Sequence, residues 1–202
     1  MSQFVARDAE MQALEKLVIG TPPATTRRNV VVVHGLGGIG KTQLAVAFAR
    51  KHKHRFSGIF WLDGSSEASL KQSFVDMVQR LPRSELTADG AQKLNQATVE
   101  ADVAVRECQQ WLSMPLNSHW LLIMDNVDRD HRDQDDLQAY DVKVYYPHAD
   151  HGSMLITSRL ANLQRLGPGV RVGTVATEQA RAILENNAGR KVEGKRISTF
   201  TK

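Results

Sequence analysis

Apolar residues along this chain form two kinds of pattern, which follow one another in turn. Continuous apolar runs predict β-strands, and they lie at about 29–34, 58–63, 120–124, 153–157 and 170–175. Stripes with an apolar residue every three or four positions predict helices, and they lie at 8–19, 43–51, 70–81, 94–112 and 177–187. Strands that are apolar throughout and alternate with helices are typical of a parallel sheet covered on both faces. We therefore expect an α/β fold.

Two polar stretches interrupt this alternation. Residues 82–90 predict a loop, and residues 128–151, which are rich in Asp, His and Arg, predict an exposed excursion. Several of the polar side chains are of types that bind metals, namely Asp133, Asp135, Asp136, His148, Asp150 and His151. Their spacing matches no known ligand arrangement, so a solvated loop is the preferred interpretation and a metal site the alternative. Trp61, Trp111 and Trp120 fall in predicted strands or helices and are expected in the core.

The first predicted strand runs directly into a glycine-rich turn. Residues 30–42 read Val-Val-Val-Val-His-Gly-Leu-Gly-Gly-Ile-Gly-Lys-Thr, which matches the phosphate-binding pattern G-x-x-x-x-G-K-[ST]. The preceding strand and the following helix supply the strand–loop–helix setting that this pattern needs. The sequence therefore predicts a nucleoside triphosphate site, and the alternative is a glycine-rich turn with a solvated lysine.

Each part of this loop has a task in holding phosphates. Glycines let the backbone N–H groups approach the anion, and the positive end of the following helix supports them. The Lys41 ammonium is expected on the β- and γ-phosphates, and the Thr42 hydroxyl on Mg²⁺. The expected nucleotide contacts are Gly35, Leu36, Gly37, Gly38, Ile39, Gly40, Lys41, Thr42 and Gln43.

An acidic residue ends the third predicted strand. Because the carboxyl ends of parallel strands meet near the phosphates, we expect Asp125 to hold Mg²⁺ together with Thr42. The candidate catalytic residues are Asp125, Asn126 and Asp128. Asn126 can hydrogen-bond a water but cannot accept its proton, so hydrolysis is expected to be slow or absent.

An arginine follows the fourth predicted strand. A guanidinium at this position, Arg159, can contact a γ-phosphate and so distinguish ATP from ADP. The alternative, from spacing alone, is an ordinary surface arginine.

Charge and composition favour a nucleotide partner over nucleic acid or membrane. The net charge is +4, and residues 190–202 hold five basic residues and one acidic residue, so the rest of the chain is balanced. Nucleic-acid binding needs a basic face on the folded body. A single cysteine, no apolar run of membrane-spanning length and no signal-peptide pattern predict a cytoplasmic protein.

Together these segments resemble the NB-ARC/NACHT class of STAND NTPases, and most of all the nucleotide domains of fungal NOD-like receptors. The matching segments are Gly-Leu-Gly-Gly-Ile-Gly-Lys-Thr-Gln-Leu-Ala at 35–45, Phe-Trp-Leu-Asp at 60–63, Trp-Leu-Leu-Ile-x-Asp-Asn-Val-Asp at 120–128 and Gly-Ser-x-Leu-Ile-Thr-x-Arg at 152–159. The resemblance implies a P-loop NTPase with an AAA+/STAND-like three-layer sandwich and a five-stranded parallel sheet of order 5-1-4-3-2. It also implies ATP, ADP and Mg²⁺ as cofactors and a switch in innate immune signalling, at rest with ADP and assembled with ATP.

The resemblance also assigns residues near the amino terminus. The family begins with two hydrophobic residues followed by Gly-Arg, and this segment packs against adenine. The similar stretch here is Phe4-Val5-Ala6-Arg7, so Val5 and Arg7 are implied near the base, although Ala6 replaces the glycine. Arg159 is likewise implied as a nucleotide sensor.

The expected organisation has three parts. Residues 1–28 form a helix and connector packed on the nucleotide domain, 29–188 form the P-loop NTPase domain, and 189–202 form a basic, disordered tail. The helical and winged-helix modules that follow in the family are not found after Gly189. An isolated or truncated nucleotide domain is therefore expected, with self-association or effector and sensor domains supplied elsewhere as partners.

Two other functions remain open alongside the switch. One is an active P-loop ATPase or a small P-loop kinase, although a kinase would need an arginine-rich lid that the sequence does not offer. The other is a scaffold that no longer binds nucleotide, against which the intact P-loop argues.

Overall fold

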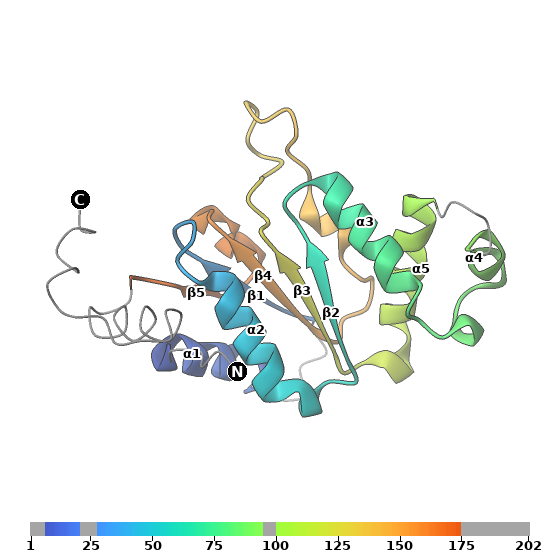
Figure 1. The fold of residues 1–202 in the computed structure, drawn as a ribbon, viewed down its shortest axis with the longest axis horizontal. Helices are drawn as coiled ribbons and strands as arrows, with labels where there is room; N and C mark the ends of the chain where they lie inside the picture. Colours follow the sequence, from blue (N-terminus) through green and yellow to red (C-terminus); the bar gives the residue numbers. More distant parts are fainter. Residues whose placement is uncertain (1–6, 21–27, 95–99, 175–202) are drawn as a thin grey trace, which may run out of the picture.

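The computed structural model describes residues 7–20, 28–94 and 100–174 (Figure 1). Val5, the connector and the predicted helix at 177–187 lie outside these residues, as does the tail.

The described part is built around one five-stranded sheet. Its strands are β1 (Asn29–His34), β2 (Gly58–Asp63), β3 (Trp120–Asp125), β4 (Ser153–Ser158) and β5 (Gly169–Arg171). All four strand pairings are parallel, and the order is β2-β3-β4-β1-β5. This is the predicted order 5-1-4-3-2 counted from the other edge, so the predicted sheet is confirmed. The fifth strand is shorter than predicted and ends at Arg171.

Helices cover both faces of the sheet and complete the three layers (Figure 1). Residues of α1 (Asp8–Val18) and α2 (Lys41–His52) pack in one core with Val31 and Val33. Residues of α3 (Glu67–Val78) and α5 (Ala101–Ser113) pack in the other core with Val30 and Val32. Successive strand residues point to opposite faces, so an unbroken apolar strand fills both cores.

Shorter helices connect these elements. They are α4 (Ala88–Lys93) and the 3-10 helices η1 (Lys53–Arg55), η2 (Arg83–Glu85), η3 (Pro115–Asn117), η4 (Val142–Tyr145) and η5 (Ala161–Leu166). The prediction of a loop throughout 82–90 was therefore wrong, because Thr87 accepts a hydrogen bond from the Gly90 N–H and so caps α4. The Glu107 carboxylate of α5 in turn accepts from the Thr87 N–H and hydroxyl.

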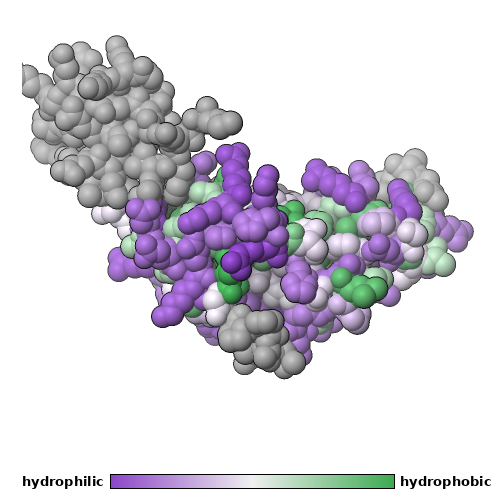
Figure 2. Space-filling view, turned by 90° about the horizontal axis from the view of Figure 1, so that it is seen from below, coloured by the Kyte–Doolittle hydropathy of each residue, from purple (hydrophilic) through white to green (hydrophobic). Residues whose placement is uncertain are grey.

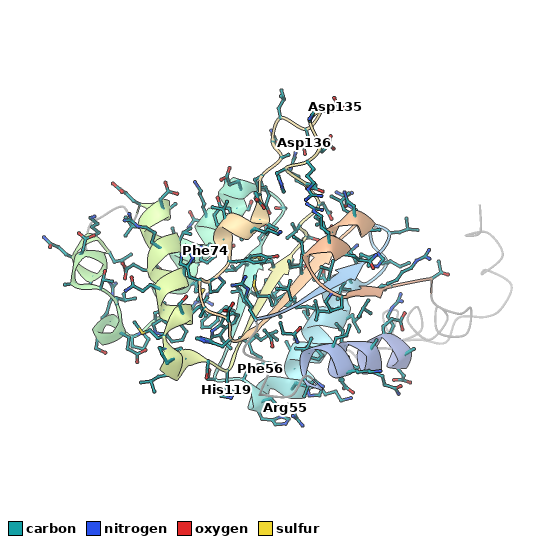
Figure 3. The ribbon with its side chains drawn as sticks, turned by 180° about the vertical axis from the view of Figure 1, so that it is seen from behind. Arg55, Phe56, Phe74, His119, Asp135 and Asp136 are labelled. Carbon is teal, nitrogen blue, oxygen red and sulfur yellow. The ribbon has the colours of Figure 1, made fainter. Side chains whose placement is uncertain are left out.

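The prediction of an exposed excursion at 128–151 is correct only for its first half. Figure 3 shows Asp135 and Asp136 at the tip of a projecting loop, with Arg55, Phe56 and His119 at the opposite end of the molecule. The second half instead buries Tyr140, Val142, Tyr145 and Tyr146 in the core.

Aromatic packing explains this burial. The ring centroids of Tyr145 and Phe74 of α3 lie 6.0 Å apart, and the Tyr140 hydroxyl donates to the Gly64 carbonyl over 2.6 Å. Tyrosine can bury its ring when its hydroxyl finds a partner, so the polar composition of the segment was misleading.

The face of the molecule seen in Figure 2 is mostly hydrophilic, with small separate hydrophobic patches. Among the described residues, no helix has the length and apolar character needed to cross a lipid bilayer.

Candidate phosphate-binding site

The glycine-rich loop connects the carboxyl end of β1 to the first turn of α2. Gly35, Gly38 and Gly40 have φ values of 154°, 70° and 100°, which residues with a Cβ rarely adopt. A Cβ at Gly35 would also lie 2.4 Å from the carbonyl oxygen of Val172, beyond β5. The loop shape thus depends on glycine, and it brings the amino terminus of α2 to the edge where the parallel strands end.

Lys41 folds back into this loop. Its side chain is 7% exposed, and its Nζ donates to the carbonyl oxygens of Gly35 over 3.0 Å and Leu36 over 2.9 Å. Burial lowers the pKa of the Lys41 ammonium, and the charges of Asp128 and Asp125 partly oppose this shift. Among the described residues, the ammonium donates to two neutral carbonyls, which an anion entering the loop would readily replace.

Thr42 and Asp125 lie in direct contact. The Thr42 hydroxyl lies 2.9 Å from Oδ1 and 3.1 Å from Oδ2 of Asp125, which is 5% exposed at the end of β3. The hydroxyl of Thr157, in β4, also donates to Asp125 Oδ1. A hydroxyl and a carboxylate are oxygen ligands of the kind Mg²⁺ takes beside substrate phosphates and water, so the pair fits the expected ion.

Asn126 turns the chain sharply after β3. Its φ is +62°, a conformation that asparagine tolerates better than most residues, and its N–H donates to the Thr157 hydroxyl over 3.0 Å. Thr157 therefore holds both Asp125 and the following residue. Sequence reasoning assigned Thr157 no role, because only the pairing of β3 with β4 brings it beside Asp125.

Asp128 and Arg159 are joined by two hydrogen bonds. Asp128 Oδ1 accepts from the Arg159 N–H and Oδ2 from Arg159 Nε, both over 2.6 Å. A Cβ at Gly37 of the loop would lie 3.5 Å from the Arg159 Cδ atom, so the arginine lies beside the loop, where it is 62% exposed. The structure thus places the predicted sensor beside the glycine-rich loop, where it forms an ion pair with Asp128.

Arg7 also contacts the loop. Its guanidinium donates to the Ile39 carbonyl over 2.7 Å, to the Gly173 carbonyl over 2.8 Å and to Glu10 over 3.0 Å, and the side chain is 8% exposed. It ties α1, the loop and the segment after β5 together. Its expected contact with adenine stays a prediction.

The alternative metal site in the polar segment gains no support. Within residues 7–20, 28–94 and 100–174, no group of three or more His, Cys, Asp or Glu side chains is placed to hold a metal ion. The His151 ring contacts the Leu112 carbonyl at 2.9 Å, which is a structural role.

The model of the NB-ARC domain family matches residues 10–193. The chain belongs to the NB-ARC family. This NB-ARC chain is 25% identical, over 185 residues, to a protein of the fungus Hyaloscypha variabilis described as a nucleotide-binding leucine-rich repeat (NLR)-like protein. The match covers 86% of the chain and 17% of that relative, so the chain spans about a sixth of its length.

Among solved structures, the NB-ARC chain is similar to Cdc6p from Pyrobaculum aerophilum, with a TM-score of 0.60 and 11% sequence identity. The similarity covers 96% of this chain and 54% of Cdc6p. At this identity it shows the fold alone, and it confirms the predicted AAA+-like P-loop architecture.

Proposed function

We propose that this NB-ARC domain is a nucleotide switch that binds ATP and ADP with Mg²⁺ and hydrolyses ATP slowly or not at all. The observation that carries the proposal is the contact between Thr42 and Asp125 beside a P-loop that encloses Lys41. The three side chains come from the loop–helix junction and from β3, and they supply the ammonium, hydroxyl and carboxylate that a magnesium–triphosphate group needs.

Lys41, Thr42 and Asp125 would each contact a different part of the bound nucleotide and its Mg²⁺. Lys41 would exchange its two carbonyl partners for β- and γ-phosphate oxygens, and loop N–H groups would hold the remaining oxygens. Thr42 and Asp125 would hold Mg²⁺, which when bound neutralises phosphate charge.

Arg159 would supply the sensing step. In the free protein it is paired with Asp128 beside Gly37. A γ-phosphate would compete with Asp128 for this guanidinium, since phosphate and carboxylate take the same arginine geometry. ATP would then break the pair and ADP would leave it intact.

The Asp128–Arg159 pair also bears on hydrolysis. While Arg159 is paired, Asp128 has both carboxylate oxygens occupied, and Asn126 cannot accept a proton. Neither is thus a ready general base, which favours a switch over an active ATPase or kinase.

The proposal also concerns the partners with which this domain would act. The fungal relative is described as NLR-like and is several times longer than this chain. We infer that effector and sensor domains, or other copies of this domain, act as partners in a cytoplasmic innate immune response.

Nucleotide binding is tested by thermal unfolding of the purified chain. Mg–ADP or Mg–ATP at about 100 times its dissociation constant should stabilise the fold by about 2.7 kcal/mol, which corresponds to about 5–10 °C for a chain of this size. Mg–GTP tests the choice of base. If no nucleotide shifts the transition, the scaffold alternative replaces the switch.

Hydrolysis is tested by comparing phosphate release from the unmodified chain and from Asn126→Asp. We expect release to be slow in the unmodified chain and at least tenfold faster in the variant, because a positioned general base contributes about 10²–10⁴-fold. Aspartate tolerates the positive φ of this position almost as well as asparagine, so the variant should fold. Rapid turnover by the unmodified chain would show that the domain is an enzyme.

A further inference from the structure

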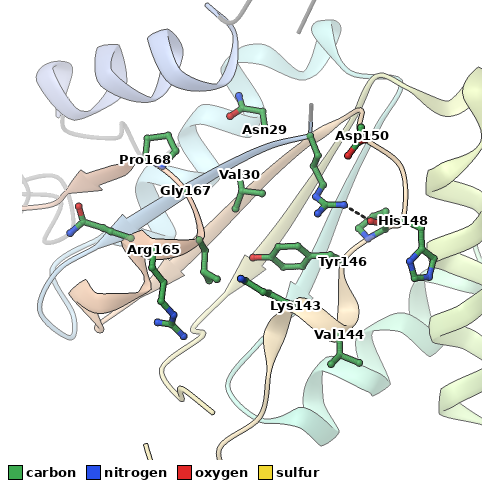
Figure 4. A pocket seen from close by; sticks show the side chains of 14 residues that line it. Asn29, Val30, Lys143, Val144, Tyr146, His148, Asp150, Arg165, Gly167 and Pro168 are labelled. Atoms are coloured by element: carbon green, nitrogen blue, oxygen red, sulfur yellow. Dashed lines mark hydrogen bonds between the residues drawn. The ribbon is translucent and has the colours of Figure 1, made fainter. Parts of the chain in front are cut away.

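A pocket lies at the other end of β1 from the P-loop. Its volume is about 1010 Å³, a size suited to a small molecule. The lining comes from three segments (Figure 4), namely the start of β1 (28–30), the stretch 143–150 and the turn before β5 (164–168). The P-loop begins after His34, so β1, at about 3.3 Å per residue, separates the two sites by about 15–20 Å.

Two hydrogen-bond donors of the residues lining this pocket find no partner among the described residues. They are the hydroxyl of Tyr146, a residue that is 7% exposed, and the buried Nε of Arg28. The Arg28 guanidinium lies over the Tyr146 ring, 5.0 Å from its centroid, and its Nη1 donates to the Pro147 and Ala149 carbonyls. Buried polar groups normally have partners, and leaving one unpaired costs about 1–3 kcal/mol.

The chemistry of these atoms selects the kind of partner that would satisfy them. Arg28 Nε can only donate, and burial raises the pKa of Tyr146, which keeps its hydroxyl protonated. An acceptor on a bound ligand would therefore satisfy both groups.

The charged side chains of the lining also favour an anion. Lys143 is exposed and has no ion pair with any described residue, whereas Arg165 is bonded to Asp130. Asp150 is the acid among the described lining residues. Figure 4 shows the Lys143 amine and the Tyr146 hydroxyl pointing away from Asp150, toward the side lined by Val30 and Arg165.

We propose that this pocket binds a small organic anion through the oxygens of a phosphate or carboxylate group. Lys143 meets the anion at the surface. When the Lys143 side chain moves aside, the anion enters and supplies the acceptors that Tyr146 and Arg28 do not find among the described residues. The hydrophobic lining, which includes Val30, Val144 and Pro168, packs against the organic part. The proposal is independent of nucleotide binding at the P-loop.

The test uses the full chain with Lys41→Ala, so that the P-loop competes weakly for anions. Pyrophosphate and citrate are titrated separately while backbone amide signals are followed by two-dimensional NMR. We expect saturable shifts at Val144, His148 and Gly167 with a dissociation constant below about 1 mM. If only pyrophosphate causes shifts, the ligand carries a phosphate group, and if only citrate does, it carries a carboxylate group. If both cause shifts, the pocket accepts an anion of either kind.

Three further variants show whether the pocket itself binds. Lys143→Ala should weaken binding about tenfold, as expected for a lost charge-assisted hydrogen bond. Tyr146→Phe should weaken it about threefold to tenfold without lowering the melting temperature, because the hydroxyl has no hydrogen-bond partner in the part of the chain that the structure describes. Lys53→Ala, in η1 and not among the residues that line the pocket, is the matched control and should change nothing. Absence of saturable shifts, or binding unchanged in both pocket variants, would overturn the proposal.

Discussion

Replacing Lys41 with alanine is expected to weaken the binding of Mg–ADP and Mg–ATP about 100-fold. Lys41 is 7% exposed, and its ammonium is held against the loop by two carbonyl oxygens. A hydrogen bond to a charged group contributes about 1.5–3 kcal/mol, and 2.7 kcal/mol corresponds to about two powers of ten. Isothermal titration calorimetry with each nucleotide measures the loss.

The control for this variant is Lys53→Ala, which removes a lysine from η1, the short helix that follows α2 away from the loop. Lys41→Ala also removes two loop hydrogen bonds in the free protein, so its melting temperature without nucleotide must be measured as well. A variant that keeps its fold and binds nucleotide within about threefold of the unmodified chain would contradict the assignment of Lys41, since the expected loss is far larger.

Replacing Gly152 with alanine is expected to destabilise the fold by about 2–5 kcal/mol. Gly152 precedes β4 with a φ of +78°, and an added Cβ would lie 2.3 Å from a ring carbon of Trp120. Trp120 cannot easily move, because it is 1% exposed and its indole N–H donates to the Leu112 carbonyl over 2.8 Å. The left-handed backbone costs an alanine about 1–2 kcal/mol, and overpacking adds about 1–3 kcal/mol.

Urea unfolding of the two proteins measures this difference, with Gly173→Ala as the matched control. Gly173 has no positive φ, and a Cβ there would meet no heavy atom within 4 Å, so its free energy of unfolding should change by less than about 0.5 kcal/mol. A Gly152→Ala variant as stable as the control would mean that the chain around Trp120 adjusts more easily than its packing indicates.

Local patterns predicted the strands and the main helices because both cores leave a direct mark on the sequence. The segment 30–33 is apolar throughout because its successive residues pack alternately in the two cores. The same rule failed for Trp61, which is 39% exposed rather than buried. It lies on β2, an edge strand, and a single strand does not reveal its place in the sheet.

Sequence was less informative where burial depends on distant partners. Of the helix expected over 94–112, the structure shows α5 (Ala101–Ser113), and residues 95–99 lie outside the described part of the chain. The Tyr140 hydroxyl donates to the Gly64 carbonyl and the Tyr145 hydroxyl to the Glu67 carboxylate, while the Tyr145 ring stacks on Phe74. These contacts explain why both tyrosines are buried. None of these contacts leaves a periodic signal.

The sequence by itself determined the strand–loop–helix of the P-loop, the acid at the end of β3 and the arginine after β4, because each depends on residue types at fixed local spacing. Only the tertiary structure decided what these groups contact. Register between β3 and β4 placed Thr157 on Asp125, and the turn after β3 paired Asp128 with Arg159. Burial of Tyr146 at the pocket beside β1 left its hydroxyl without a hydrogen-bond partner among the described residues. These contacts join residues about 30 or more positions apart, and such partners are chosen by packing of the whole sheet rather than by local sequence.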